Sequence, residues 1–130
     1  MEYRNYQKAI IERGTPMLKK YGLLYLAMEV RTGKTFTALG ICQNMAVENV
    51  LFVTKKKAIS SIEADIATLA PDYDTYVINY ESLHKIPEQK WDIIICDEAH
   101  SMGAFAPPSN RAKQVKALIA RNSCDLILLS

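Results

Sequence analysis

Short apolar runs alternate with amphipathic stretches along this chain. Five of the runs have the length of a β-strand, and they lie at 22–28, 50–54, 75–79, 92–96 and 124–129. Strands that are apolar throughout and alternate with helices are typical of a parallel sheet with both faces covered. The pattern therefore predicts an open α/β fold of three layers, in which a parallel sheet lies between helices.

The stretches between these runs carry apolar residues at helical spacing. A helix is expected from residue 34 to about 46, a second one before Pro71, and a third ahead of the last strand. The inward residues of the second and third are Ile59, Ile62, Ile66 and Leu69, and Ala112, Val115, Leu118 and Ile119. Ahead of the first strand, residues 3–13 predict a short helix that ends at Gly14, with Pro16 beyond it.

Length, charge and cysteine positions exclude several classes of protein for this chain. A chain of 130 residues is enough for one domain with a real core. Its net charge of +2 is too balanced for a polyelectrolyte, so any contact with nucleic acid needs a local patch. The three cysteines lie far apart in apolar runs, which predicts buried, reduced thiols in an intracellular protein and no zinc site. No run has the length of a membrane span, and the N-terminus lacks the core of a signal peptide.

Polar residues follow every strand of the expected sheet. In a parallel sheet, ligands bind beyond the carboxyl ends of the strands. The segments at these ends are 29–35, 55–57, 80–82, 97–100 and Ser130. We therefore expect the active site at this edge.

Gly33, Lys34 and Thr35 stand where the first strand turns into a helix. They match the end of a phosphate-binding loop, in which Lys34 would reach the β- and γ-phosphates and the Thr35 hydroxyl would bind Mg²⁺. The full loop pattern has glycine where this chain has Met28. The alternative is an ordinary helix start with a threonine cap.

Asp97 and Glu98 end the fourth apolar run as two adjacent carboxylates. Core packing does not explain them, because burying an unpaired charge is costly. Asp97 is placed to hold Mg²⁺, usually through a water, and Glu98 to polarise the water that attacks the γ-phosphate. The alternative is a loop that carries two solvated acids.

The order of these motifs resembles that of superfamily-two helicases. Residues 97–100 have the DEAH form of motif II, residues 27–35 look like motif I, and 50–57 resemble motif Ia. Residues 77–83 are similar to the segment before motif II, and 126–130 to the strand that leads into motif III. Within the superfamily, the chain resembles the Swi/Snf-type branch of DNA translocases, including its phage members. In place of that branch's usual glycine and aspartate in motif I, the chain has Arg31 and Met28.

The resemblance implies roles for further residues. Thr32 and Arg31 would belong to the phosphate loop, Arg31 adding a cation near the phosphates. Gln7, after Tyr6, is similar to the glutamine of the Q-motif, which reads the adenine edge and selects ATP. His100 and Ser130 correspond to positions that couple motif II to motif III. For Gln7, a solvated glutamine on a surface helix is the alternative.

Lys55, Lys56 and Lys57 precede a helix, where cations oppose the helix dipole. Phosphates of a nucleic acid would compensate them, and Tyr80 could add a backbone contact. The alternatives are a solvated turn for the lysines and the edge of the core for Tyr80.

Together these features predict a RecA-like P-loop NTPase lobe, incomplete at motif III, that spans residues 1–130. The resemblance implies ATP and Mg²⁺ as cofactors, DNA as partner, duplex rather than RNA, and the cytoplasm of a bacterial or phage-infected cell. It also implies a second RecA-like lobe, normally in the same chain, that supplies an arginine finger, so this part alone is expected to be inactive. The alternatives are a non-catalytic nucleotide- or DNA-binding module and the motor part of a restriction enzyme.

Overall fold

The computed structural model describes residues 2–28, 33–98 and 110–130. Its helices are α1 (Asn5–Tyr21), α2 (Lys34–Asn44), α3 (Ile59–Leu69) and α4 (Asn110–Asn122), with short 3₁₀ helices η1 (Lys56–Ala58) and η2 (Tyr80–Lys85). Its strands are β1 (Leu23–Leu26), β2 (Asn49–Thr54), β3 (Asp74–Asn79), β4 (Ile93–Cys96) and β5 (Asp125–Leu129). The strands form one sheet in the order β1-β5-β4-β2-β3, and every described pairing is parallel. The predicted α/β fold is confirmed.

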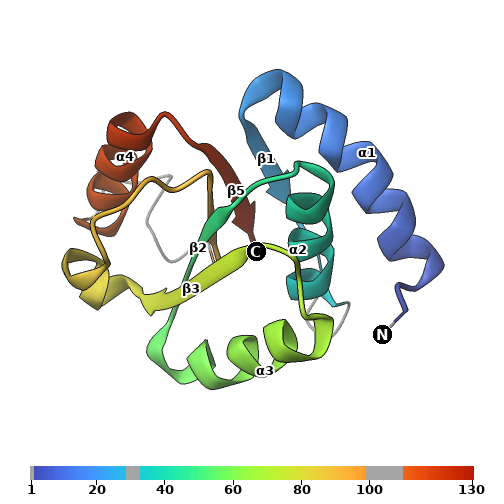
Figure 1. Ribbon diagram of the computed structural model, residues 1–130, viewed down its shortest axis with the longest axis horizontal. Helices are drawn as coiled ribbons and strands as arrows, with labels where there is room; N and C mark the ends of the chain where they lie inside the picture. Colours follow the sequence, from blue (N-terminus) through green and yellow to red (C-terminus); the bar gives the residue numbers. More distant parts are fainter. Residues whose placement is uncertain (1, 29–32, 99–109) are drawn as a thin grey trace.

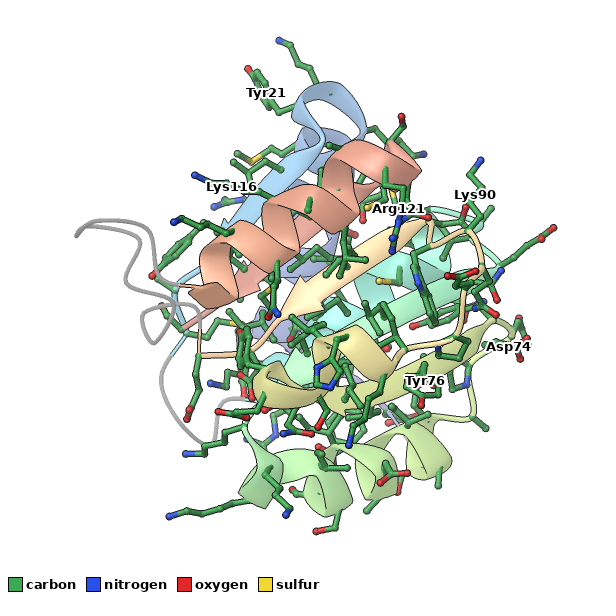
Figure 2. All side chains as sticks on the ribbon, turned by 90° about the vertical axis from the view of Figure 1, so that its left-hand side faces the viewer. Tyr21, Asp74, Tyr76, Lys90, Lys116 and Arg121 are labelled. Atoms are coloured by element: carbon green, nitrogen blue, oxygen red, sulfur yellow. The ribbon has the colours of Figure 1, made fainter. Side chains whose placement is uncertain are left out.

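Helices cover both faces of the sheet (Figure 1). The α1, α2 and α3 helices lie on one face, where Ile11, Leu39 and Ile62 join a cluster with Phe52 and Ile95 of the strands. On the other face, α4 and η2 pack Val115, Leu118 and Leu83 against Leu51 and Ile94. The three predicted layers are therefore present, with one apolar cluster on each side of the sheet. The outer side of α4 carries Lys116 and Arg121 into solvent (Figure 2).

The prediction that the first helix ends at Gly14 is wrong. The α1 helix continues through Gly14 and Pro16 to Tyr21, and Gly22 caps it in the left-handed conformation at a φ of 71°. A β-carbon at position 14 would lie 3.0 Å from side-chain atoms of Ile41 and Leu24, so there is little room for any residue other than glycine. Close packing of α1 on α2 and β1 therefore explains this glycine.

The first strand is also shorter than predicted and is not buried throughout. It lies at the edge of the sheet, and its burial alternates, with Leu23 and Tyr25 about half exposed and Leu24 and Leu26 buried. An edge strand with one covered face needs only alternate apolar positions. The prediction of a strand buried on both faces at 22–28 is therefore wrong, because only one face of β1 is buried.

All three cysteines, Cys42, Cys96 and Cys124, are buried and unpaired, as the sequence predicts. Among the described residues, no helix is both long and apolar enough to cross a membrane.

Candidate nucleotide-binding site

The described part of the turn into α2 consists of Gly33 and the first residues of the helix. Gly33 has a φ of 72°, in the left-handed region that favours glycine, and Lys34 is the first residue of the helix. The Gly33 carbonyl accepts bonds from the backbone N–H and the hydroxyl of Thr37, at 3.0 Å each. The N-cap is thus a glycine and not a threonine, so the predicted alternative of a threonine cap is wrong.

Gln7 of α1 supports this turn. Its Nε2 donates to the Gly33 carbonyl at 3.2 Å, and its Oε1 accepts from the backbone N–H of Arg4 at 2.8 Å. The side chain is buried, and a β-carbon on Gly33 would collide with it. The alternative of a solvated glutamine is therefore excluded, although these contacts do not test whether Gln7 reads adenine.

The Asp97 carboxylate is the centre of the site. Although Asp97 is only 6% exposed, it is well partnered. Lys34 Nζ lies 3.2 Å from its Oδ1, the Thr54 hydroxyl donates to its Oδ2 at 2.9 Å, and the Glu98 N–H donates to Oδ1 at 3.0 Å. An ammonium and a carboxylate, 63 residues apart in sequence, thus meet at the carboxyl edge of the sheet.

Strand register brings these groups together. Val53 of β2 pairs with Cys96 of β4, and the Asp97 N–H donates to the Val53 carbonyl at 2.8 Å. Thr54 and Asp97 therefore lie side by side where the two strands end. Sequence reasoning assigned no role to Thr54. Thr54 could have been recognised as a hydroxyl residue at the end of an apolar strand, if β2 had been expected to lie next to β4.

Tyr80 also contacts this centre, from inside the core. Its hydroxyl donates to the Asp97 carbonyl oxygen at 2.6 Å, and the residue is 1% exposed. The structure thus favours the core-edge alternative and contradicts the prediction that Tyr80 contacts nucleic acid. A side chain buried this deeply is not accessible to a polymer in solution.

Glu98 and Lys55 form a second ion pair beside the first. Lys55 Nζ lies 2.9 Å from Glu98 Oε1, and the two side chains are 50% and 26% exposed. The hydrogen bond from Lys55 to Glu98, with the charge of that carboxylate, raises the pKa of Lys55. Glu98 has a φ of 52°, which is uncommon for a residue with a β-carbon. Lys56 and Lys57 are exposed.

The described residues fit a magnesium ion that is held with a bound phosphate. No group of three or more acidic, histidine or cysteine side chains gathers within the described ranges. Mg²⁺ usually keeps several waters and takes one or two protein ligands beside substrate phosphates, so no protein cage is required. Asp97 and the Thr35 hydroxyl, the latter in the first turn of α2, offer the hard oxygen ligands that this ion prefers.

Four further residues were predicted to belong to the site. Arg31, Thr32 and His100 fall outside the described residues. Ser130 follows β5 as expected, and its hydroxyl accepts from the Tyr25 hydroxyl at 2.6 Å. Its carbonyl accepts from the Met28 N–H at 3.3 Å, so the ends of β1 and β5 are joined.

No family model matches the sequence, and no curated protein matches it. Solved structures do match its fold. A SWI2/SNF2 ATPase core of Sulfolobus solfataricus, in complex with double-stranded DNA, has a TM-score of 0.78 and 19% identity over 100% of this chain and 32% of that chain.

Two Type ISP restriction-modification enzymes are also similar. LlaBIII, bound to DNA, has a TM-score of 0.64 and 19% identity over 100% of this chain and 12% of its own. A nuclease-deletion mutant of LlaGI, in complex with a DNA substrate mimic, has a TM-score of 0.61 and 18% identity over 100% of this chain and 17% of its own. The chain thus spans a third or less of each of these proteins. At such identities the likeness is one of fold: a five-stranded parallel α/β sheet that matches the RecA-like lobe of the SWI2/SNF2 ATPase core.

Proposed function

We propose that this chain is the ATP-binding lobe of a DNA translocase. The observation that carries the proposal is the contact of Lys34 with Asp97, 3.2 Å apart at the carboxyl edge of a parallel sheet. An ammonium at the start of α2 and a buried carboxylate just after β4 are the groups that a nucleoside triphosphate and its metal need. The fold of the DNA-bound ATPase neighbours supports the same conclusion.

Each group has a defined task in this proposal. Lys34 leaves Asp97 and turns to the β- and γ-phosphates, while the first N–H groups of α2 face the same anion. Asp97 and Thr35 hold Mg²⁺, which neutralises charge on the phosphates when it is bound. Glu98 accepts a hydrogen bond from the attacking water and orients it. Gln7 keeps Gly33 in place and contacts the adenine.

The arginine that stabilises the transition state comes from a second lobe in this proposal. Movement on duplex DNA would then follow from opening and closing of the two lobes. A motor within a restriction enzyme is the second candidate, because the LlaBIII and LlaGI structures match the whole of this chain. The two candidates share this site and differ in the domains attached to it.

The proposal is tested by ATP binding, measured calorimetrically with Mg²⁺ present. Lys34→Ala should weaken ATP binding at least about tenfold, because hydrogen bonds between charged groups are lost. Glu98→Gln should bind ATP like the wild type and should block hydrolysis when a second lobe is supplied. Lys57→Ala, which removes an exposed lysine of the same edge, is the matched control.

Equal ATP affinity of the wild type and Lys34→Ala would contradict the phosphate-loop assignment. Binding of ATP with no turnover, even beside a complete second lobe, would instead favour the non-catalytic module. Circular dichroism of each variant establishes that it is folded.

A further inference from the structure

Two side chains for which different partners are predicted contact each other. Lys55 begins the basic run 55–57, for which nucleic acid is the proposed partner, and Glu98 is the proposed water-orienting residue. Lys55 Nζ and Glu98 Oε1 are 2.9 Å apart. The proposed nucleic-acid contact and the proposed hydrolytic group are therefore directly joined.

The sheet register makes this contact a consequence of the fold. Since Val53 pairs with Cys96, the next positions place Thr54 beside Asp97 and then Lys55 beside Glu98. The first of these two contacts is buried, because Thr54 and Asp97 are both buried. The second is open to solvent, because half of the Lys55 side chain is exposed. The two pairs thus differ in how easily a ligand can reach them.

An exposed ion pair is easily exchanged for another one. Its net stabilisation is small, because water and salt screen it and two side chains must be held in place. The flexible stem of a lysine lets the ammonium turn toward a different anion. A nucleic-acid backbone presents phosphates at high density, and the exposed Lys56 and Lys57 would help to hold it beside Lys55.

We propose that the Lys55–Glu98 ion pair is an inhibitory contact, and that a DNA backbone phosphate relieves it by taking Lys55. While paired, Lys55 occupies an oxygen of the Glu98 carboxylate that the attacking water would use. Binding of DNA then transfers the ammonium to a phosphate and returns that oxygen to the nucleotide site. This inference rests on the proposed function and adds to it a regulation of hydrolysis by DNA.

Competition between Glu98 and a DNA phosphate for the Lys55 ammonium should be detectable in DNA affinity, without any measurement of hydrolysis. If Glu98 and a phosphate compete for Lys55, removal of the Glu98 charge must strengthen the phosphate contact, because such coupling is reciprocal. The gain must depend on Lys55. A general effect of removing one negative charge near DNA would persist without Lys55.

The experiment is a double-mutant cycle on DNA affinity at constant salt. The wild type, Glu98→Gln, Lys55→Met and the double variant are titrated into a short fluorescent DNA duplex, and anisotropy is measured. Glu98→Gln should tighten binding about two- to fivefold, the range expected for loss of one exposed ion pair. In the Lys55→Met background, the same change should have no more effect than Glu63→Gln, which neutralises an exposed carboxylate of α3.

Lys55→Arg keeps the cation and should retain the coupling. Equal tightening with and without Lys55, or no tightening at all, would overturn the inference and leave the proposed function standing. If no variant binds DNA, both the inference and the DNA part of the proposed function fail. The ATP part is judged separately by Lys34→Ala.

Discussion

At the scale of single residues, Asp97 is the side chain on which the contacts of the site converge. Its carboxylate and carbonyl are contacted from α2, from the end of β2 and from η2, through Lys34, Thr54 and Tyr80. A carboxylate this buried would be costly without partners. Because the partners come from separate segments, the position of Asp97 depends on the packing of all of them.

Thr54→Val tests this view. Valine has the shape of threonine but cannot donate to Asp97 Oδ2, so a buried charge loses a hydrogen bond. The free energy of unfolding should fall by about 1.5–3 kcal/mol, as measured by urea denaturation. Thr54→Ser keeps the hydroxyl and loses one methyl group, which should cost about 1 kcal/mol.

The same substitution in an Asp97→Asn background supplies the control. With a neutral acceptor the hydrogen bond is weaker, so Thr54→Val should cost clearly less there. An equal loss in both backgrounds would mean that the hydroxyl does not act through the Asp97 charge.

The sequence predicted Lys34, Asp97 and Glu98 as site residues, because their side chains do not fit an apolar core and their motifs are local. The contacts of Asp97 with Thr54 and Tyr80 could not be predicted. They depend on which strands are neighbours, and β2 lies next to β4 with β3 on its other side. Sequence order does not reveal that arrangement. The ion pair of Lys55 with Glu98 was missed for the same reason.

At the scale of elements, the end of α1 shows where local signals fail. Gly14 and Pro16 are both typical of helix termini. The helix nevertheless continues, because Ile11, Gly14, Thr15 and Leu18 are buried by the fold. The Thr15 hydroxyl donates to the Ile11 carbonyl at 2.8 Å in the turn that holds the proline. Burial of one face of α1 thus stabilises the helix more than Gly14 and Pro16 destabilise it.

Gly22, the residue that caps the C-terminus of α1, can be tested by substitution. Its φ of 71° is strained for any residue with a β-carbon, and that atom would lie 3.3 Å from Asp125 Oδ1. Gly22→Ala should therefore lower the free energy of unfolding by about 1–2 kcal/mol.

Gly22→Asn is the matched variant, because asparagine tolerates the left-handed conformation better than alanine. It should lose less stability than Gly22→Ala in the same urea titration. If alanine is the better tolerated of the two, the backbone conformation of Gly22 is not what limits α1.

At the scale of the whole molecule, one apolar cluster lies on each face of the sheet, and both clusters contain cysteine thiols. Cys42 lies in the cluster with α1, α2 and α3, and Cys96 and Cys124 in the cluster with α4. Burial raises the pKa of all three, to about 12 for Cys96 and to about 11 for Cys124. Global unfolding therefore exposes groups that titrate at lower pH than in the folded chain.

The sign of the resulting pH dependence follows from proton linkage. Above about pH 9 the unfolded chain releases thiol protons that the folded chain retains, so the unfolded state binds fewer protons and stability falls as pH rises. Burial also raises the pKa of Tyr73, which acts in the same direction at higher pH. Each thiol contributes a slope of at most about 1.4 kcal/mol per pH unit.

Cys96→Ala isolates one of these contributions, because it removes a single titrating group from the cluster beside α4. The free energy of unfolding, measured by urea denaturation between about pH 8 and about pH 10, should decline less steeply in this variant than in the wild type. Ile94→Val shrinks a buried, non-ionising side chain of the same cluster, so it should lower the whole curve without changing its slope. If Cys96→Ala and the wild type have the same slope, the Cys96 thiol is not held protonated by burial. The alkaline loss of stability would then come from other groups, with Tyr73 as the first to test.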